Sequence, residues 1–118
     1  LLWQEAGVDR SSRGIKKALF SIYQDIQVTN DQPLLEFICN QEKDKSSSLD
    51  EPDRMKLNLL LDLSHRQIAS VLMLEACLFR KESRGGHFRS DAPLPLTYWE
   101  CHSVQKRGNN ISTRPVTK

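Results

Sequence analysis

A run of apolar residues at helical spacing between Pro52 and Lys81 constrains the fold of this chain more than any other feature. One face of the predicted helix carries Leu57, Leu60, Leu61, Ser64, Ile68, Val71, Leu72, Glu75 and Leu78. Pro52 or Asp53 would open this helix, which would extend about 40 Å at about 1.5 Å per residue. Its second half is apolar on most sides, so we expect it to be covered on more than one face. It would be the central helix of a bundle, or a helix docked on another domain.

Shorter helical segments flank this element. Ser11 or Ser12 can cap a helix, because serine oxygens accept hydrogen bonds from free amides in the first turn. The apolar face of that helix consists of Ile15, Ala18, Leu19, Ile22 and Ile26. Pro33 disfavours helical geometry before it, so a kink or a second short helix should follow. Residues 41–53 are polar and serine-rich and predict a mobile loop, whereas residues 1–7 would be the end of a further helix.

Together these patterns predict an all-α domain that resembles a three-helix bundle. Its predicted core consists of Ile15, Leu19, Ile22, Leu60, Leu61, Ile68, Leu72 and Cys77. Prolines at positions 93 and 95, followed by Tyr98 and Trp99, favour an extended strap along the bundle. We therefore expect residues 94–118 to form an extended tail that is partly disordered, because its last residues are polar.

Charge and cysteine content argue against several classes of function. The chain has seventeen Lys and Arg residues and fifteen Asp and Glu residues, so its net charge is only +2. This balance argues against a basic surface that would bind nucleic acid or anionic lipid. No stretch reaches the roughly 18 apolar residues that cross a bilayer. Cys39, Cys77 and Cys101 are widely spaced, so we expect no disulfide framework, no metal site and a cytoplasmic protein. Without an initiator Met or a signal peptide, the chain starts like a segment of a longer polypeptide.

The candidate functional segment follows the long helix and spans residues 80–93. Its residues of interest are Glu82, Ser83, Arg84, Gly85, His87, Arg89 and Asp91. Two interpretations are open from the residues alone. The paired glycines would cap the end of the helix, or Arg84, His87 and Arg89 would project toward a neighbouring domain and bind it through polar contacts. Nearby arginines should in either case keep His87 neutral.

The same segment resembles the ESRG-x-H-x-R-x-D-x-P signature near the C-terminus of succinate dehydrogenase, fumarate reductase and L-aspartate oxidase flavoproteins. The matching residues are Glu82, Ser83, Arg84, Gly85, His87, Arg89, Asp91 and Pro93. The beginning of the chain resembles the MW-x-x-AG-I/V-x-R segment of the L-aspartate oxidase family, from which Leu2 and Asp9 depart. Its matching residues are Trp3, Ala6, Gly7, Val8 and Arg10. Trp99 and His102 resemble instead a W-x-x-H pattern of some succinate dehydrogenases.

This resemblance covers residues 1–93 and implies that they form the C-terminal helical domain of an FAD enzyme that oxidises L-aspartate to iminoaspartate for NAD biosynthesis. Its partners would be the flavin-binding and capping domains of the same polypeptide, on which residues 82–91 would dock. The chain has no G-x-G-x-x-G fingerprint, so FAD should bind elsewhere and the chain alone should be inactive, without catalytic, cofactor-binding or metal-binding residues. Two alternatives stay open: the same domain of a succinate dehydrogenase or fumarate reductase flavoprotein subunit, and a free-standing helical interaction module.

Overall fold

A computed structural model of the chain describes residues 7, 9–41 and 48–117, most of which are helical. Its elements are helices α2 (Ser12–Asn30), α3 (Pro33–Cys39) and α4 (Glu51–Phe79), a short 3-10 helix η1 (Thr97–Trp99), and strands β1 (Cys101–Val104) and β2 (Ser112–Pro115). The predicted helical fold is confirmed, with a two-stranded sheet added. Residues 1–6 of the helix predicted at residues 1–7 and residues 42–47 of the predicted mobile loop lie outside the described residues. The loop prediction was wrong for residues 51–53, which form the first turn of α4.

Local capping explains where the two longer helices begin. The Ser11 hydroxyl accepts a hydrogen bond of 3.1 Å from the Gly14 amide, as the sequence predicted for the start of α2. Asp50 has the same role at α4, because its carboxylate accepts a bond of 2.9 Å from the Asp53 amide. Helix α4 therefore begins at Glu51, slightly earlier than predicted, and it ends at Phe79. Pro33 stands in the first turn of α3, where a proline needs no helical partner.

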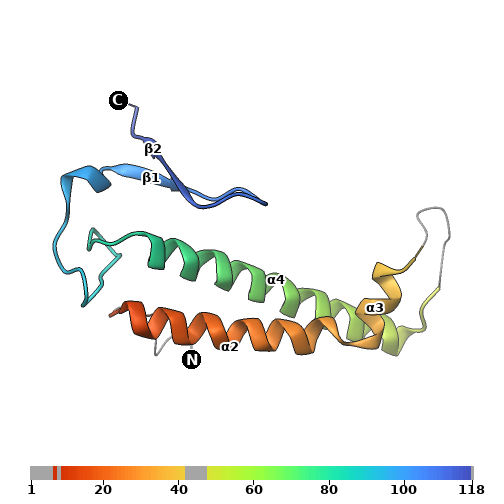
Figure 1. Cartoon of the computed structure of the whole chain (residues 1–118). Helices are drawn as coiled ribbons and strands as arrows, with labels where there is room; N and C mark the ends of the chain where they lie inside the picture. Colours follow the sequence, from red (N-terminus) through yellow and green to blue (C-terminus); the bar gives the residue numbers. More distant parts are fainter. Residues whose placement is uncertain (1–6, 8, 42–47, 118) are drawn as a thin grey trace.

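Helices α2 and α4 pack antiparallel, and α3 lies across the end where α4 begins (Figure 1). The buried core between them consists of Ile15, Ala18, Leu19, Ile22 and Leu74, with Ile26, Val71, Cys77 and Leu78 packed against it. The prediction was correct for α2 and wrong for Ile68 and Leu72 of α4, which are 52% and 45% exposed. Leu60 and Leu61 are only partly buried. Helix α2 covers one face of α4, and α3 contacts α4 only near its beginning, so the second apolar face stays largely exposed at Ile68 and Leu72.

Beyond α4 the chain forms an antiparallel hairpin rather than a simple strap. Strands β1 and β2 pair Cys101 with Pro115 and Val104 with Ser112, and the hairpin lies on the side of α4 opposite α2 (Figure 1). The molecule measures 55 × 33 × 19 Å with a radius of gyration of 18.5 Å. A compact domain of this length would have a radius of about 13.5 Å. The fold is thus flattened and elongated, and much of its apolar surface faces outward.

In the described part of the chain, none of the helices combines the length and the apolar character needed to cross a membrane.

Candidate functional site

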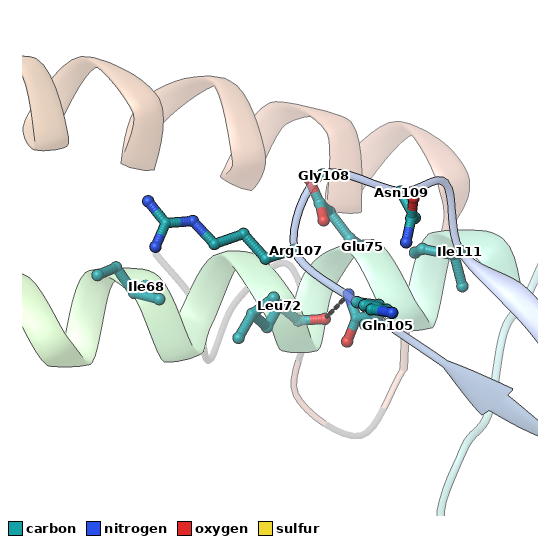
Figure 2. Close-up of a pocket in the computed structure, with 9 residues that line it drawn as sticks. Ile68, Leu72, Glu75, Gln105, Arg107, Gly108, Asn109 and Ile111 are labelled. Atoms are coloured by element: carbon teal, nitrogen blue, oxygen red, sulfur yellow. Dashed lines mark hydrogen bonds between the residues drawn. The ribbon is translucent and has the colours of Figure 1, made fainter.

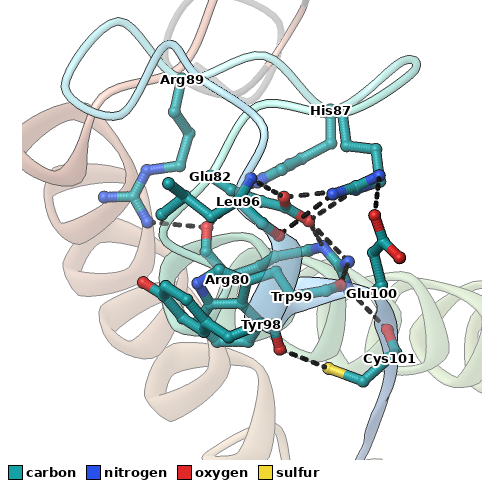
Figure 3. A network of polar contacts seen from close by, with 10 residues as sticks. Arg80, Glu82, His87, Arg89, Leu96, Tyr98, Trp99, Glu100 and Cys101 are labelled. Carbon is teal, nitrogen blue, oxygen red and sulfur yellow. Dashed lines mark hydrogen bonds and ion pairs between the residues drawn. The ribbon is translucent and has the colours of Figure 1, made fainter. Parts of the chain in front are cut away.

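The signature segment begins directly after α4 with a buried carboxylate, that of Glu82. This side chain is fully buried, and it accepts hydrogen bonds from Arg80 Nε at 2.8 Å, Arg84 Nε at 3.1 Å and the Leu96 amide at 3.0 Å (Figure 3). Burial alone would raise the pKa of Glu82, but the hydrogen bonds from Arg84, Leu96 and Arg80 outweigh it and lower the pKa to about 2. Glu82 is therefore ionised at neutral pH and ties three segments of the chain together.

Arg89 closes the C-terminal end of α4. Its buried guanidinium donates from Nη1 to the carbonyl oxygens of Cys77, Leu78 and Arg80 at 3.2, 2.9 and 3.2 Å. Its Nε and Nη2 atoms bind the two Asp91 oxygens at 3.0 and 2.5 Å, and this pairing lowers the pKa of Asp91. The last carbonyls of a helix lack intrahelical partners, so a cation placed there is strongly favoured. The guanidinium of Arg89 points inward, which does not fit the interpretation in which it projects toward a neighbouring domain.

Ser83 holds the returning chain against the helix end. Its hydroxyl donates to the Ala92 carbonyl at 2.7 Å and accepts from the Arg89 amide at 2.8 Å, while its own amide donates to Leu94 at 3.3 Å. The residue is nearly fully buried. A buried hydroxyl that both donates and accepts leaves no unsatisfied group, so this serine fixes the position of Arg89.

The paired glycines form a tight turn instead of the predicted helix cap. Arg84 and His87 exchange backbone hydrogen bonds of 2.8 and 3.0 Å across Gly85 and Gly86. Gly85 has φ of +56°, which a residue with a side chain rarely adopts. The helix itself is capped at Arg80, whose φ is −79°. A positive φ is therefore needed for the turn, and the carbonyls of the helix end are satisfied by the Arg89 side chain.

His87 joins the signature to the beginning of the described chain. Its Nε2 lies 3.2 Å from the Arg80 carbonyl oxygen, which can only accept, so Nε2 carries the proton. Its Nδ1 then accepts from Arg10 Nη1 at 3.3 Å. Burial, with the positive charges of Arg10, Arg89 and Arg80, lowers the pKa of His87, which is the direction that the sequence predicted. The Arg10 carbonyl also accepts from the Ser90 amide at 2.7 Å.

Arg80 and Trp99 connect the network to the C-terminal hairpin, and sequence reasoning gave neither a role at this site. Arg80 donates to the carbonyl oxygens of Cys101, at 3.0 Å, and Trp99, and its guanidinium lies 5.6 Å from the centre of the indole ring (Figure 3). The Phe79 ring meets the indole edge to face at 5.3 Å. The sequence did contain a signal for Arg80, because it is an arginine between the apolar helix and the signature. An arginine at that place can pair with a buried carboxylate such as that of Glu82.

Most polar groups of the signature are engaged in holding the segment together. Arg84 is engaged as well, because its Nε donates to Glu82 and its Nη2 donates to the Leu96 carbonyl oxygen at 3.1 Å. Its side chain is nevertheless 39% exposed, and its Nη1 lies 3.9 Å from the carboxylate of the exposed Glu100. Phe88, between His87 and Arg89, is 41% exposed. In the described residues no group of His, Cys, Asp and Glu side chains is arranged to hold a metal ion. The geometry thus describes a structural junction with an exposed tip at residues 84–88.

Comparison with known proteins places this junction in context. The family model for the fumarate reductase flavoprotein C-terminus matches residues 1–118. The chain is 30% identical over 116 residues to an L-aspartate oxidase of Synechocystis sp., covering 98% of this chain and 21% of that protein. It is also 30% identical over 108 residues to an L-aspartate oxidase of Nostoc sp., covering 91% of this chain and 19% of that protein. The chain therefore spans about a fifth of the length of these relatives. No solved structure matches it.

Proposed function

The chain belongs to the family of fumarate reductase flavoprotein C-terminal domains, and we propose that it is the C-terminal domain of an L-aspartate oxidase. The complete enzyme would be a longer, cytoplasmic polypeptide that oxidises L-aspartate to iminoaspartate with bound FAD. Oxygen or fumarate would reoxidise the reduced flavin. The product would enter NAD biosynthesis through quinolinate synthase.

One observation carries this proposal: the two segments that resemble the family meet in space. Arg10 belongs to the segment that is similar to L-aspartate oxidases, and His87 belongs to the flavoprotein signature 77 residues later. Their side chains are 3.3 Å apart, and the Arg10 carbonyl also accepts two hydrogen bonds from Ser90. Residues that are close in the fold and far apart in the sequence support a single structural unit rather than two chance matches.

The residues of this chain do not fit FAD. A dinucleotide pyrophosphate binds at a glycine-rich turn between a strand and the N-terminus of a helix. Gly85 and Gly86 instead follow the C-terminus of α4, and in the described residues no strand leads into the start of a helix. The flavin would therefore be held by the preceding four fifths of the polypeptide. We assign no catalytic residue and no cofactor ligand to this chain.

Its role would be architectural, with the signature as a docking element. Glu82, Ser83, Arg89 and Asp91 would form the rigid base of that element through the contacts described above. The tip at residues 84–88, which includes Arg84, Gly85, His87 and the exposed Phe88, would contact the flavin-binding or capping domain. A tip held by a buried ionic network is preorganised, so little conformational entropy would be lost on docking.

Genetic complementation tests the proposed function. The complete reading frame that contains residues 1–118 would be expressed in a bacterial strain that lacks its own L-aspartate oxidase and needs added nicotinate. Growth without nicotinate is the expected result. Failure to restore this growth, together with rescue of a strain that lacks succinate dehydrogenase, would instead identify a succinate dehydrogenase flavoprotein. Rescue of neither strain by a stable product that lacks flavin would favour the free-standing module.

A further inference from the structure

The second apolar face of α4 lines a groove whose other wall is the hairpin. Ile68 and Leu72, which are 52% and 45% exposed, form its floor beneath the loop that joins β1 to β2 (Figure 2). The cavity between α4 and this loop has a volume of about 690 Å³. Gln105 Nε2 donates to the Leu72 carbonyl oxygen at 3.0 Å and so fixes the hairpin at one side of this cavity.

The groove continues along α4 toward the signature. A second cavity of about 520 Å³ shares Glu75, Asn109 and Ile111 with the first and extends to Leu78 and Phe79. We call the two cavities together the α4–hairpin groove. From Ile68 to Phe79 it follows α4 for roughly 16 Å, at about 1.5 Å per residue. An elongated groove with an apolar floor suits a polypeptide segment better than a compact small molecule.

The charged side chains of the groove indicate what kind of segment would fit. Lys106 and Arg107 stand on the hairpin wall, and the Arg107 side chain extends along the groove near Ile68 (Figure 2). Neither cation pairs with a carboxylate of the described residues. Glu75, the acidic residue of the lining, already accepts a hydrogen bond of 2.8 Å from the Tyr23 hydroxyl. Two cations against one carboxylate leave the lining with a net positive charge, above an apolar floor.

We propose that the α4–hairpin groove binds a segment of the flavin-bearing part of the same polypeptide, one that combines apolar side chains with carboxylates. This inference rests on the proposed function. An isolated two-stranded hairpin is marginally stable in water, and such a segment would hold it against α4. The apolar side chains would cover Ile68 and Leu72, and the carboxylates would pair with Lys106 and Arg107.

Cysteine labelling of the complete polypeptide tests whether the groove is covered. Ile68→Cys places a thiol in the groove, and Leu59→Cys places one elsewhere on α4, where Leu59 is 70% exposed. Both variants carry Cys39→Ser to remove the exposed native thiol, and labelled peptides are located by mass spectrometry. Maleimide should modify position 68 at least about tenfold more slowly than position 59, because it reacts only when the docked segment opens. Equal rates would overturn the inference.

Zero-length crosslinking by carbodiimide tests the chemistry of the occupant. Lys106 should form an amide with an Asp or Glu outside residues 1–118 of the same polypeptide, whereas the exposed Lys56 on α4 serves as the matched control. Crosslinks of Lys106 only to carboxylates within residues 1–118, or to a second copy in isotope-mixed protein, would overturn the proposal. Complementation is independent of both readouts. If the complete polypeptide is an active L-aspartate oxidase whose groove is open, only the inference that the groove binds a segment is refuted. If the groove is covered but the polypeptide is a succinate dehydrogenase, only the proposed function is refuted.

Discussion

Replacing Arg89 by alanine tests whether this side chain, rather than the glycines, secures the end of α4. The substitution removes a buried guanidinium that serves three helix carbonyls and the Asp91 carboxylate. Breaking a buried ion pair typically costs about 3 to 5 kcal/mol. Because Asp91 is 37% exposed and can be rehydrated, we expect the lower end of this range, about 3 kcal/mol. At roughly 4 °C per kcal/mol, the melting temperature would fall by about 12 °C.

Urea and thermal unfolding of the 118-residue chain, followed by circular dichroism, measure this loss directly. Arg66→Ala is the matched control, because Arg66 lies on α4 itself, is 77% exposed and pairs with Asp62 at 2.9 Å. Such exposed pairs contribute less than about 1 kcal/mol. Arg89→Lys should be intermediate, since a single ammonium cannot reach both the carbonyls and the carboxylate. A loss for Arg89→Ala that equals the loss for Arg66→Ala would refute the capping role.

Three further predictions follow from the same segment. Acid should lower the free energy of unfolding in two steps. The first begins below the ordinary histidine pKa of 6.5, because folding lowers the pKa of His87 and only the unfolded chain takes up the proton. The second begins below about pH 5, where the unfolded chain protonates Glu82 while the folded chain keeps it ionised down to its pKa of about 2. Urea midpoints across this range check both steps, and Glu82→Gln should flatten the second. Gly85→Ala should cost about 1 kcal/mol because φ is +56°, whereas Gly86→Ala should change stability by less than about 0.5 kcal/mol; similar values would contradict the turn geometry. Phe88→Asp should leave the melting temperature of the isolated chain unchanged but lower the FAD content of the complete enzyme, and a loss confined to the isolated chain would contradict docking through the tip.

The helices could be predicted from the sequence because their causes are local. Ser11 precedes a face of apolar residues at helical spacing, and that pattern allows only one secondary structure. The same periodicity failed for Ile68 and Leu72, because it identifies apolar faces and not the number of elements available to cover them. If the groove is filled in the complete enzyme, these two residues are core residues of the larger protein.

The signature was harder to interpret because its contacts depend on a reversal of the chain. Nothing in the sequence near Arg89 shows that residues 83–92 fold back and place its guanidinium under the carbonyls of Cys77 and Leu78. A glycine pair after a helix also suggests a cap on local grounds, although here it forms a turn farther along. The hairpin was missed for a related reason: β2 is exposed throughout, so it lacks the alternation of apolar and polar residues that identifies a strand.

The most direct test of the central claim is an anaerobic absorption spectrum of the complete polypeptide before and after addition of L-aspartate. We expect an FAD spectrum that L-aspartate bleaches and succinate does not, and a colourless 118-residue chain even after incubation with FAD and gel filtration. A flavin that is reduced by succinate but not by L-aspartate, or flavin absorbance that stays with the isolated chain, would contradict the account.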